Sequence, residues 1–139
     1  MYTEYCIDIP NSKFIGDPTE GVALNLEVLS FLGDVDRRTG TIVSEDTKAR
    51  GHQVKDRILI VKKFRGSTVG VYVLYSLCKN GLAPKAVICG EPDPVIVAGI
   101  VLCSITGVFK VPETIMEQIK NGDRIRIEPL KNGARICIA

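Results

Sequence analysis

The sequence predicts an α/β domain built on a mixed sheet, with a βαβα centre and β-hairpin material at both ends. An apolar, β-branched run of strand length (57–61) is followed by a stretch with apolar residues at helical spacing (69–78). A second strand-like run (86–89) is followed by an apolar helical stretch (94–103). Near the C-terminus, strict alternation over residues 124–128 indicates a half-buried strand. Two strand–helix units in succession predict the βαβα centre.

Length and composition favour one ordinary globular domain covering residues 1–139. The chain is 45% hydrophobic and 24% charged, with a formal net charge of +2. A chain of this size buries enough surface for a core, and the charge lacks the basic excess typical of nucleic-acid binding. We therefore expect neither a nucleic-acid partner nor a membrane partner. The first residues lack an export signal and the longest nearly uncharged run is too short to span a bilayer, so the expected location is cytoplasmic.

The N-terminal third has the weakest pattern. Residues 1–20 are expected to be loosely structured, because glycine and proline lie among polar residues after position 10. Short strands are predicted over residues 22–24 and 26–32, followed by a turn-rich segment, 33–40, and a strand at 41–43. The polar stretch 44–53 is predicted to be a loop.

The turn between the first central strand and its helix is the candidate site. Gly66 can adopt backbone angles that other residues avoid, and Ser67 or Thr68 is a preferred N-cap. Free N–H groups of a first helical turn attract anions, and Arg65 adds a planar set of donors suited to carboxylate or phosphate. The pattern equally fits a well-capped turn with a solvated arginine, and the local residues alone do not separate these two interpretations.

The second half of the chain carries clear boundary signals. Gly81 is a natural end for the first helix, and Asp93 with Pro94 is a natural start for the second. The second helix is apolar on all sides, so it must be covered by the sheet, by other helices or by a partner. A strand is predicted at 109–111 and a short helix within 112–120. The Lys131-Asn132-Gly133 turn predicts a hairpin between the alternating strand and residues 134–138.

The five cysteines do not form a metal-site pattern. They are odd in number, widely spaced and without a C-x-x-C pair, and His52 is the single histidine, so no metal site is predicted on this chain. Four of them lie within apolar runs, where a free cysteine behaves as a small buried hydrophobe: Cys78, Cys89, Cys103 and Cys137.

Several segments, in their order along the chain, resemble the small subunit of the aconitase X family. The resemblance covers roughly residues 21–111 and includes the Arg65-Gly66-Ser67-Thr68 turn. The matching segments are 30–36, 39–40, 57–61, 65–68, 80–84 and 91–92. The resemblance implies a swivelling β/β/α domain and a large catalytic partner subunit that carries an iron–sulfur cluster, with no cofactor on this chain.

The resemblance is strongest to the archaeal branch of the family, and it implies a reaction. That reaction is the dehydration of 5-phosphomevalonate to trans-anhydromevalonate 5-phosphate. In that reaction a Lewis acid helps the tertiary hydroxyl to leave, and a base takes a proton from the carbon beside the carboxylate. By resemblance, Ser67 is the proton acceptor in a site shared with the large subunit. Arg65, Gly66 and Thr68 are the expected substrate-binding residues.

Three alternatives remain open from the sequence. The chain could serve a related dehydratase acting on another hydroxy acid or on a hydroxyproline. It could be a swivelling phospho-carrier domain, which would use His52 in place of Ser67. It could also be an interaction module without chemistry, with the apolar second helix and the C-terminal hairpin as its surfaces.

Overall fold

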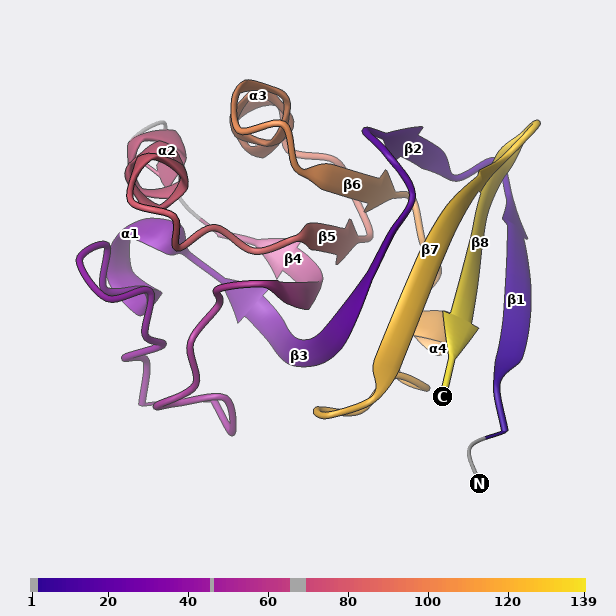
Figure 1. Ribbon diagram of the computed structural model, residues 1–139, viewed down its shortest axis with the longest axis horizontal. Coiled ribbons are helices and arrows are strands. Elements are labelled where there is room, and N and C mark those ends of the chain that lie inside the picture. Colours follow the sequence, from indigo (N-terminus) through magenta and orange to yellow (C-terminus); the bar gives the residue numbers. More distant parts are fainter. Residues whose placement is uncertain (1–2, 46, 66–69) are drawn as a thin grey trace.

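The structure is a computed structural model that describes residues 3–45, 47–65 and 70–139. Its strands form one mixed sheet in the order β1-β8-β7-β3-β4-β5-β6-β2 (Figure 1). The strands are β1 Tyr5–Pro10, β2 Lys13–Ile15, β3 Thr19–Leu29, β4 Arg57–Phe64, β5 Ala86–Cys89, β6 Thr106–Phe109, β7 Arg124–Leu130 and β8 Gly133–Ile138. The helices are α1 Phe31–Asp34, α2 Gly70–Lys79, α3 Pro94–Leu102 and α4 Glu113–Met116.

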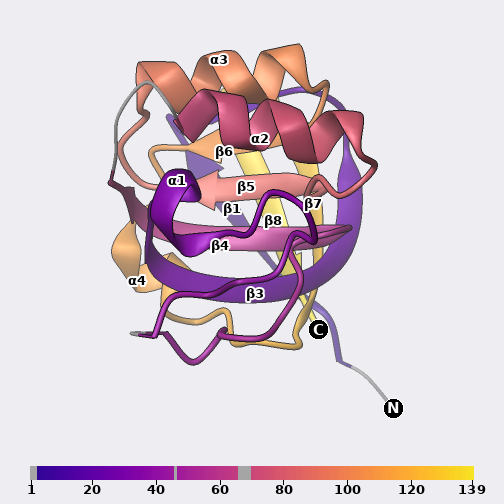
Figure 2. The ribbon, with the colours of Figure 1, turned by 90° about the vertical axis from the view of Figure 1, so that its left-hand side faces the viewer.

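The sheet folds over on itself, which gives three layers. Strands β7, β8 and β1 stand apart from β4, β5 and β6, while α2 and α3 lie on the opposite side of β4–β6 (Figures 1 and 2). Side chains alternate along β4: Leu59 and Val61 pack in a core beneath the helices, while Ile58 and Ile60 pack in a second core with residues of β7 and β8. The fold is therefore the predicted β/β/α arrangement.

The central βαβα unit is confirmed. Strands β3, β4, β5 and β6 are parallel neighbours, with α2 connecting β4 to β5 and α3 connecting β5 to β6. Gly81 follows α2 with φ +71°, a left-handed conformation that glycine adopts without steric cost. Asp93 caps α3 and Pro94 is its first residue, as predicted.

Within residues 3–20, the structure differs from the prediction of a loose segment. Strand β1 pairs antiparallel with β8, and β2 pairs antiparallel with β6 at the other end of the sheet. The two strands are separated by Asn11, with φ +65°, and the buried Ser12, whose hydroxyl donates to the Ile9 carbonyl at 2.8 Å. Each of these strands is held by pairing with a strand that lies far away in the sequence, so a local sequence pattern could not predict either strand. The N-terminal strands thus join the sheet without pairing with each other.

Further boundaries also differ. The two short strands predicted within 22–32 are one long strand, β3, whose register shifts around Glu27 at φ +56°, followed by the short helix α1. Residues 41–43 make only isolated bridges, from Thr41 to Gln53 and from Ile42 to Val35. Strand β6 ends at Phe109, two residues before the predicted end. The loop character of residues 44–53 and the β7–β8 hairpin agree with the predictions.

The prediction that the cysteines of the apolar runs are free is wrong for three of the four. Disulfides join Cys6 to Cys137 and Cys78 to Cys103, whereas Cys89 is free and buried. Cys6 and Cys137 are register partners on β1 and β8, although 131 residues separate them in sequence. Cys78 and Cys103 meet because α2 packs against α3. The spacing of the cysteines along the sequence does not indicate either pairing.

The apolar helix α3 is covered on one side only. Within this helix, Ile96, Gly99 and Ile100 are buried, while Val101 and Leu102 are 58% and 64% exposed. None of the described helices is long and apolar enough to cross a membrane.

Candidate functional site

The candidate site lies where the parallel strands end. Arg65 directly follows β4 and is exposed, and its backbone N–H donates to the Leu29 carbonyl at the end of β3, at 2.8 Å. In open α/β sheets, ligands bind beside the carboxyl ends of the parallel strands, where the loops into the following helices gather. The fold thus places Arg65 at the edge of the sheet that is best suited to bind a ligand.

A shallow depression adjoins Arg65. Its base includes Phe31 and Phe64, whose rings stack with centroids 5.9 Å apart. Its walls come from the ends of β4, α1, α2 and α3, with lining residues Phe31, Phe64, Arg65, Gly70, Asp93, Val95 and Ile96. As formed by these residues it has a volume of only about 10 Å³, which is roughly one water molecule. Small-molecule pockets usually enclose about 300–1,000 Å³, so the described residues alone do not enclose a substrate here.

The carboxylate in this depression has a structural role. One Asp93 oxygen accepts hydrogen bonds from the backbone N–H groups of Val95 and Ile96, at 2.8 and 3.2 Å. These bonds satisfy donors at the N-terminus of α3, so that terminus is already occupied by a side chain. Asp93 is therefore a helix cap, and Arg65 is the charged group of the depression that faces solvent.

The described part of the site contains one of the four predicted site residues. Arg65 directly follows β4, which extends to Phe64, three residues beyond the predicted strand 57–61, and the predicted helix begins at Gly70. Gly66, Ser67 and Thr68 lie outside the described residues. His52 is exposed in the 44–53 loop, where its backbone bonds to Ile42 and Ala49.

A second cation at this sheet edge was not predicted. Lys110 is exposed and directly follows β6, with φ +62°, and its N–H donates to the Gly90 carbonyl at 2.6 Å. It ends a strand two positions from β4 in the sheet, which corresponds to roughly 10 Å. Lys110 lies within the strand predicted at 109–111, and no local signal in the sequence indicates that the strand stops at Phe109.

The cysteines of this chain do not fit an iron–sulfur cluster. Among the described residues, one group offers three candidate metal ligands close together: Glu4, Cys6 and Cys137. Both sulfurs of that group are in a disulfide, whereas a cluster is held by several thiolates. The free Cys89 is buried, and burial raises its pKa to about 12, which disfavours the thiolate.

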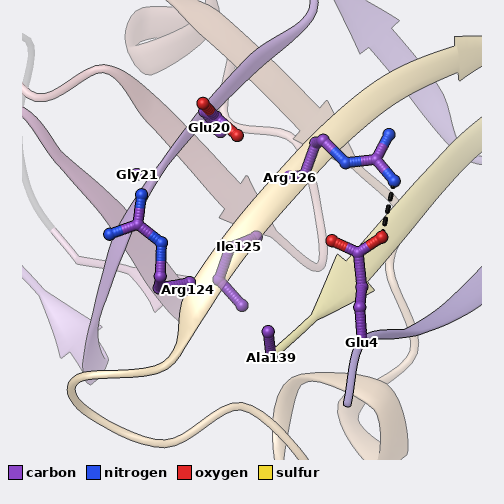
Figure 3. Close-up of a pocket in the computed structure, with 7 residues that line it drawn as sticks. All are labelled: Glu4, Glu20, Gly21, Arg124, Ile125, Arg126 and Ala139. Carbon is purple, nitrogen blue, oxygen red and sulfur yellow. Dashed lines mark hydrogen bonds and ion pairs between the residues drawn. The ribbon is translucent and has the colours of Figure 1, made fainter. Parts of the chain in front are cut away.

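A larger cavity lies on another part of the molecule. It has a volume of about 300 Å³ and lies beside β7, at the start of β3 and the N-terminal segment (Figure 3). Glu4 and Arg126 form an ion pair of 2.7 Å across it, and the full lining is Glu4, Glu20, Gly21, Arg124, Ile125, Arg126 and Ala139. Arg65, the predicted site residue that the structure describes, does not line this cavity.

Known proteins resemble this chain over most of its length. The aconitase X swivel domain family matches residues 9–136. The phosphomevalonate dehydratase small subunit of Pyrococcus horikoshii is 39% identical over 115 residues, which are 83% of this chain and 84% of the relative. The corresponding subunit of Archaeoglobus fulgidus is 45% identical over 107 residues, 76% of this chain and 80% of the relative. The crystal structure of Thermococcus kodakaraensis aconitase X, in its holo-form, has a TM-score of 0.82 and 31% identity, covering 99% of both chains. The chain belongs to the aconitase X swivel domain family.

Proposed function

We propose that this chain is the small subunit of a hydro-lyase that dehydrates 5-phosphomevalonate to trans-anhydromevalonate 5-phosphate, a step of isoprenoid biosynthesis. The observation that carries the proposal is the site at the end of β4. Its depression holds about one water molecule and presents the exposed Arg65, so the described residues do not enclose a substrate by themselves, and in this proposal a partner supplies part of the pocket. The names of the relatives as small subunits support a large catalytic subunit as that partner.

The residues of this chain would contribute binding and proton transfer. Arg65 offers a planar fork of donors for the substrate carboxylate or phosphate. Gly66 and Thr68 would shape the turn beside the substrate, and Ser67 would accept the proton from the carbon next to the carboxylate. A serine hydroxyl is a weak acid, so this role requires preorganised donors and positive charge in a site closed to water.

The cofactor belongs to the partner in this proposal. An iron–sulfur cluster on the large subunit would supply the Lewis acid, because the disulfides and the buried Cys89 leave a donor set on this chain that does not fit a cluster. The test is anaerobic reconstitution of this chain alone with iron and sulfide, with the disulfides left intact. We expect no stoichiometric cluster absorbance, and a clear signal would contradict the assignment.

The decisive assay uses both subunits. This chain is mixed with the cluster-loaded large subunit, and 5-phosphomevalonate is followed to its anhydro product by mass spectrometry. We expect turnover with the pair and none with either subunit alone. Turnover by the large subunit alone at the rate of the pair would favour an interaction module without chemistry.

Competing substrates are included in the same assay. Unphosphorylated mevalonate tests the contribution of the phosphate, and 4-hydroxyproline tests the related dehydratase function. A preference for hydroxyproline would change the proposed substrate but keep the proposed reaction class, a dehydration. Incorporation of phosphate at His52 would instead favour a phospho-carrier, and we expect none.

The proposal places the complex in the cytoplasm.

A further inference from the structure

The Cys6–Cys137 disulfide differs from the Cys78–Cys103 disulfide in the charges around its sulfurs. Arg126 Nη2 donates towards Cys137 Sγ at 3.5 Å, whereas Cys6 Sγ lies 3.8 Å from a carboxylate oxygen of Glu4. In the other pair, Cys103 Sγ contacts an uncharged group, the Leu74 carbonyl, at 3.8 Å. The first disulfide thus has a cation beside one sulfur and an anion beside the other.

The two sulfurs also differ in access. Cys6 is exposed on the edge strand β1, whereas Cys137 is 1% exposed on β8. Glu4 and Arg126, which contact the sulfurs, also line the cavity of about 300 Å³ (Figure 3). A cavity of this size admits a small molecule. A reagent in solution can therefore approach the disulfide from the side of Cys6.

From these observations we propose that Cys6–Cys137 is a thiol–disulfide exchange site for low-molecular-weight thiols, with Cys6 Sγ as the atom attacked and Cys137 Sγ as the leaving group. The external thiolate forms a bond to Cys6 Sγ while the Cys6–Cys137 bond breaks, and Cys137 leaves as a thiolate. A second external thiolate attacks the mixed disulfide and releases Cys6, which takes a proton. Two thiols are oxidised to one external disulfide, and the protein disulfide is reduced to two thiols.

The charges favour this direction of attack. Exchange is faster when the leaving sulfur is the more stable thiolate, and a neighbouring cation stabilises a thiolate. Arg126 therefore favours departure of Cys137. The Glu4 carboxylate disfavours a thiolate at Cys6, so Cys6 is the poorer leaving group. Solvent access and the neighbouring charges thus both favour attack at Cys6 Sγ.

Exchange at this site changes how the edge of the sheet is held. The disulfide ties β1 to β8, and without it β1 keeps its ladder of backbone pairs and the Asp8–Arg135 ion pair. An edge strand held by fewer constraints opens more often, so we expect faster hydrogen exchange over residues 5–10 in the reduced protein.

The first measurement locates the attack on the full wild-type chain. Oxidised protein is treated with a limiting amount of reduced glutathione, quenched with acid and mapped by non-reducing peptide mass spectrometry. We expect untreated protein to contain the Cys6–Cys137 crosslinked peptides, and treated protein to carry glutathione on Cys6. A mixed disulfide at Cys137, or alkylation of both cysteines by iodoacetamide in the untreated protein, would overturn the proposal.

The second measurement tests Arg126. Arg126→Gln should slow glutathione reduction of this disulfide by about threefold, for a leaving-group pKa raised by roughly one unit and a Brønsted slope near 0.5. Arg135→Gln is the matched control, because Arg135 lies on the same hairpin and its ion pairs are with carboxylates, Asp8 and Glu128. Circular dichroism confirms that both variants fold. Equal slowing in both variants would assign the effect to strand loosening and contradict the role of Arg126.

Discussion

Arg135 and Asp8 face each other across β8 and β1 and share two hydrogen bonds, of 2.6 and 3.1 Å. Arg135 also contacts Glu128 on β7, so one guanidinium links three strands. The pair faces solvent, and with the Cys6–Cys137 disulfide it connects the N-terminal strand to the C-terminal hairpin.

The first prediction concerns pH. The hydrogen bond from Arg135 lowers the pKa of Asp8 below its ordinary value of 3.8. Because the folded pKa is the lower one, the stabilisation is present above the ordinary value and is lost as the pH falls through the folded value. Asp8→Asn should therefore have a lower Tm than wild type at neutral pH, and this difference should shrink below about pH 4. Thermal unfolding at several pH values checks this, and a difference independent of pH would refute it.

The second prediction concerns Gly133, the first residue of β8. A Cβ at this position would overlap the Ile9 carbonyl oxygen and touch the Ser12 hydroxyl. Gly133→Ala should destabilise the protein by roughly 2 to 4 kcal/mol, because a backbone atom cannot move aside as a flexible side chain can. Gly33→Ala is the control, since nothing lies within 4 Å of its added Cβ, and it should change the unfolding free energy by less than about 0.5 kcal/mol. Urea denaturation measures both, and equal stabilities would contradict the close approach of β1 to β8.

The third prediction concerns the free cysteine. Burial raises the pKa of Cys89 to about 12, so almost no thiolate exists at neutral pH. Iodoacetamide should therefore leave Cys89 unlabelled in the native, non-reduced protein and label it fully after unfolding in guanidinium. Peptide mass spectrometry reads the site, and labelling of native Cys89 as fast as that of a free peptide thiol would show that it is accessible.

The fourth prediction separates the roles of Ser67 and Arg65 in the proposed complex. Ser67→Ala should lower turnover by about 100-fold to 10,000-fold, the usual contribution of a general base, with little effect on folding. Arg65→Lys keeps the charge and loses the planar fork, so it should chiefly raise the Michaelis constant. Steady-state dehydration by the reconstituted pair measures both. A Ser67→Ala complex that retains more than about a tenth of the turnover would make Ser67 a helix cap rather than the base.

The fifth prediction concerns the surface that meets the large subunit. If the partner supplies the missing wall of the depression, its binding should slow hydrogen exchange around Arg65, the start of α2 and the 33–40 segment. Residues 124–138 serve as the internal control and should be little affected. Protection confined to that hairpin would place the interface on the opposite layer of the fold.

Much of the central unit follows from short stretches of sequence. Residues 57–61 are β-branched and apolar, Gly81 tolerates a positive φ, and Asp93 precedes Pro94, so strand, helix end and helix start are each determined by local chemistry. The same local chemistry placed Arg65 in the turn between a strand and a helix, and it indicated the residues from Gly66 to Thr68 as part of the candidate site. The family resemblance added the roles of those residues, which remain predictions.

Strand pairing over long distances required the tertiary structure. Strands β1 and β2 find their partners in β8 and β6, and Cys6 meets Cys137 because they share a register position. Strand propensity depends on what packs against each face, so a segment whose partners are far away in sequence carries a weak local signal. For the same reason the local sequence did not predict Lys110 as a cation beside the site, because its position at the sheet edge depends on where β6 ends.

The sequence by itself thus determined the α/β class, the central strand–turn–helix units and the place of Arg65, because apolar periodicity and helix caps act over a few residues. Only the tertiary structure decided how the N-terminal strands close the sheet, which cysteines pair and how little space the described site encloses. Those features depend on which distant side chains meet when the two layers of the sheet bury a common core, and that is a property of the whole fold.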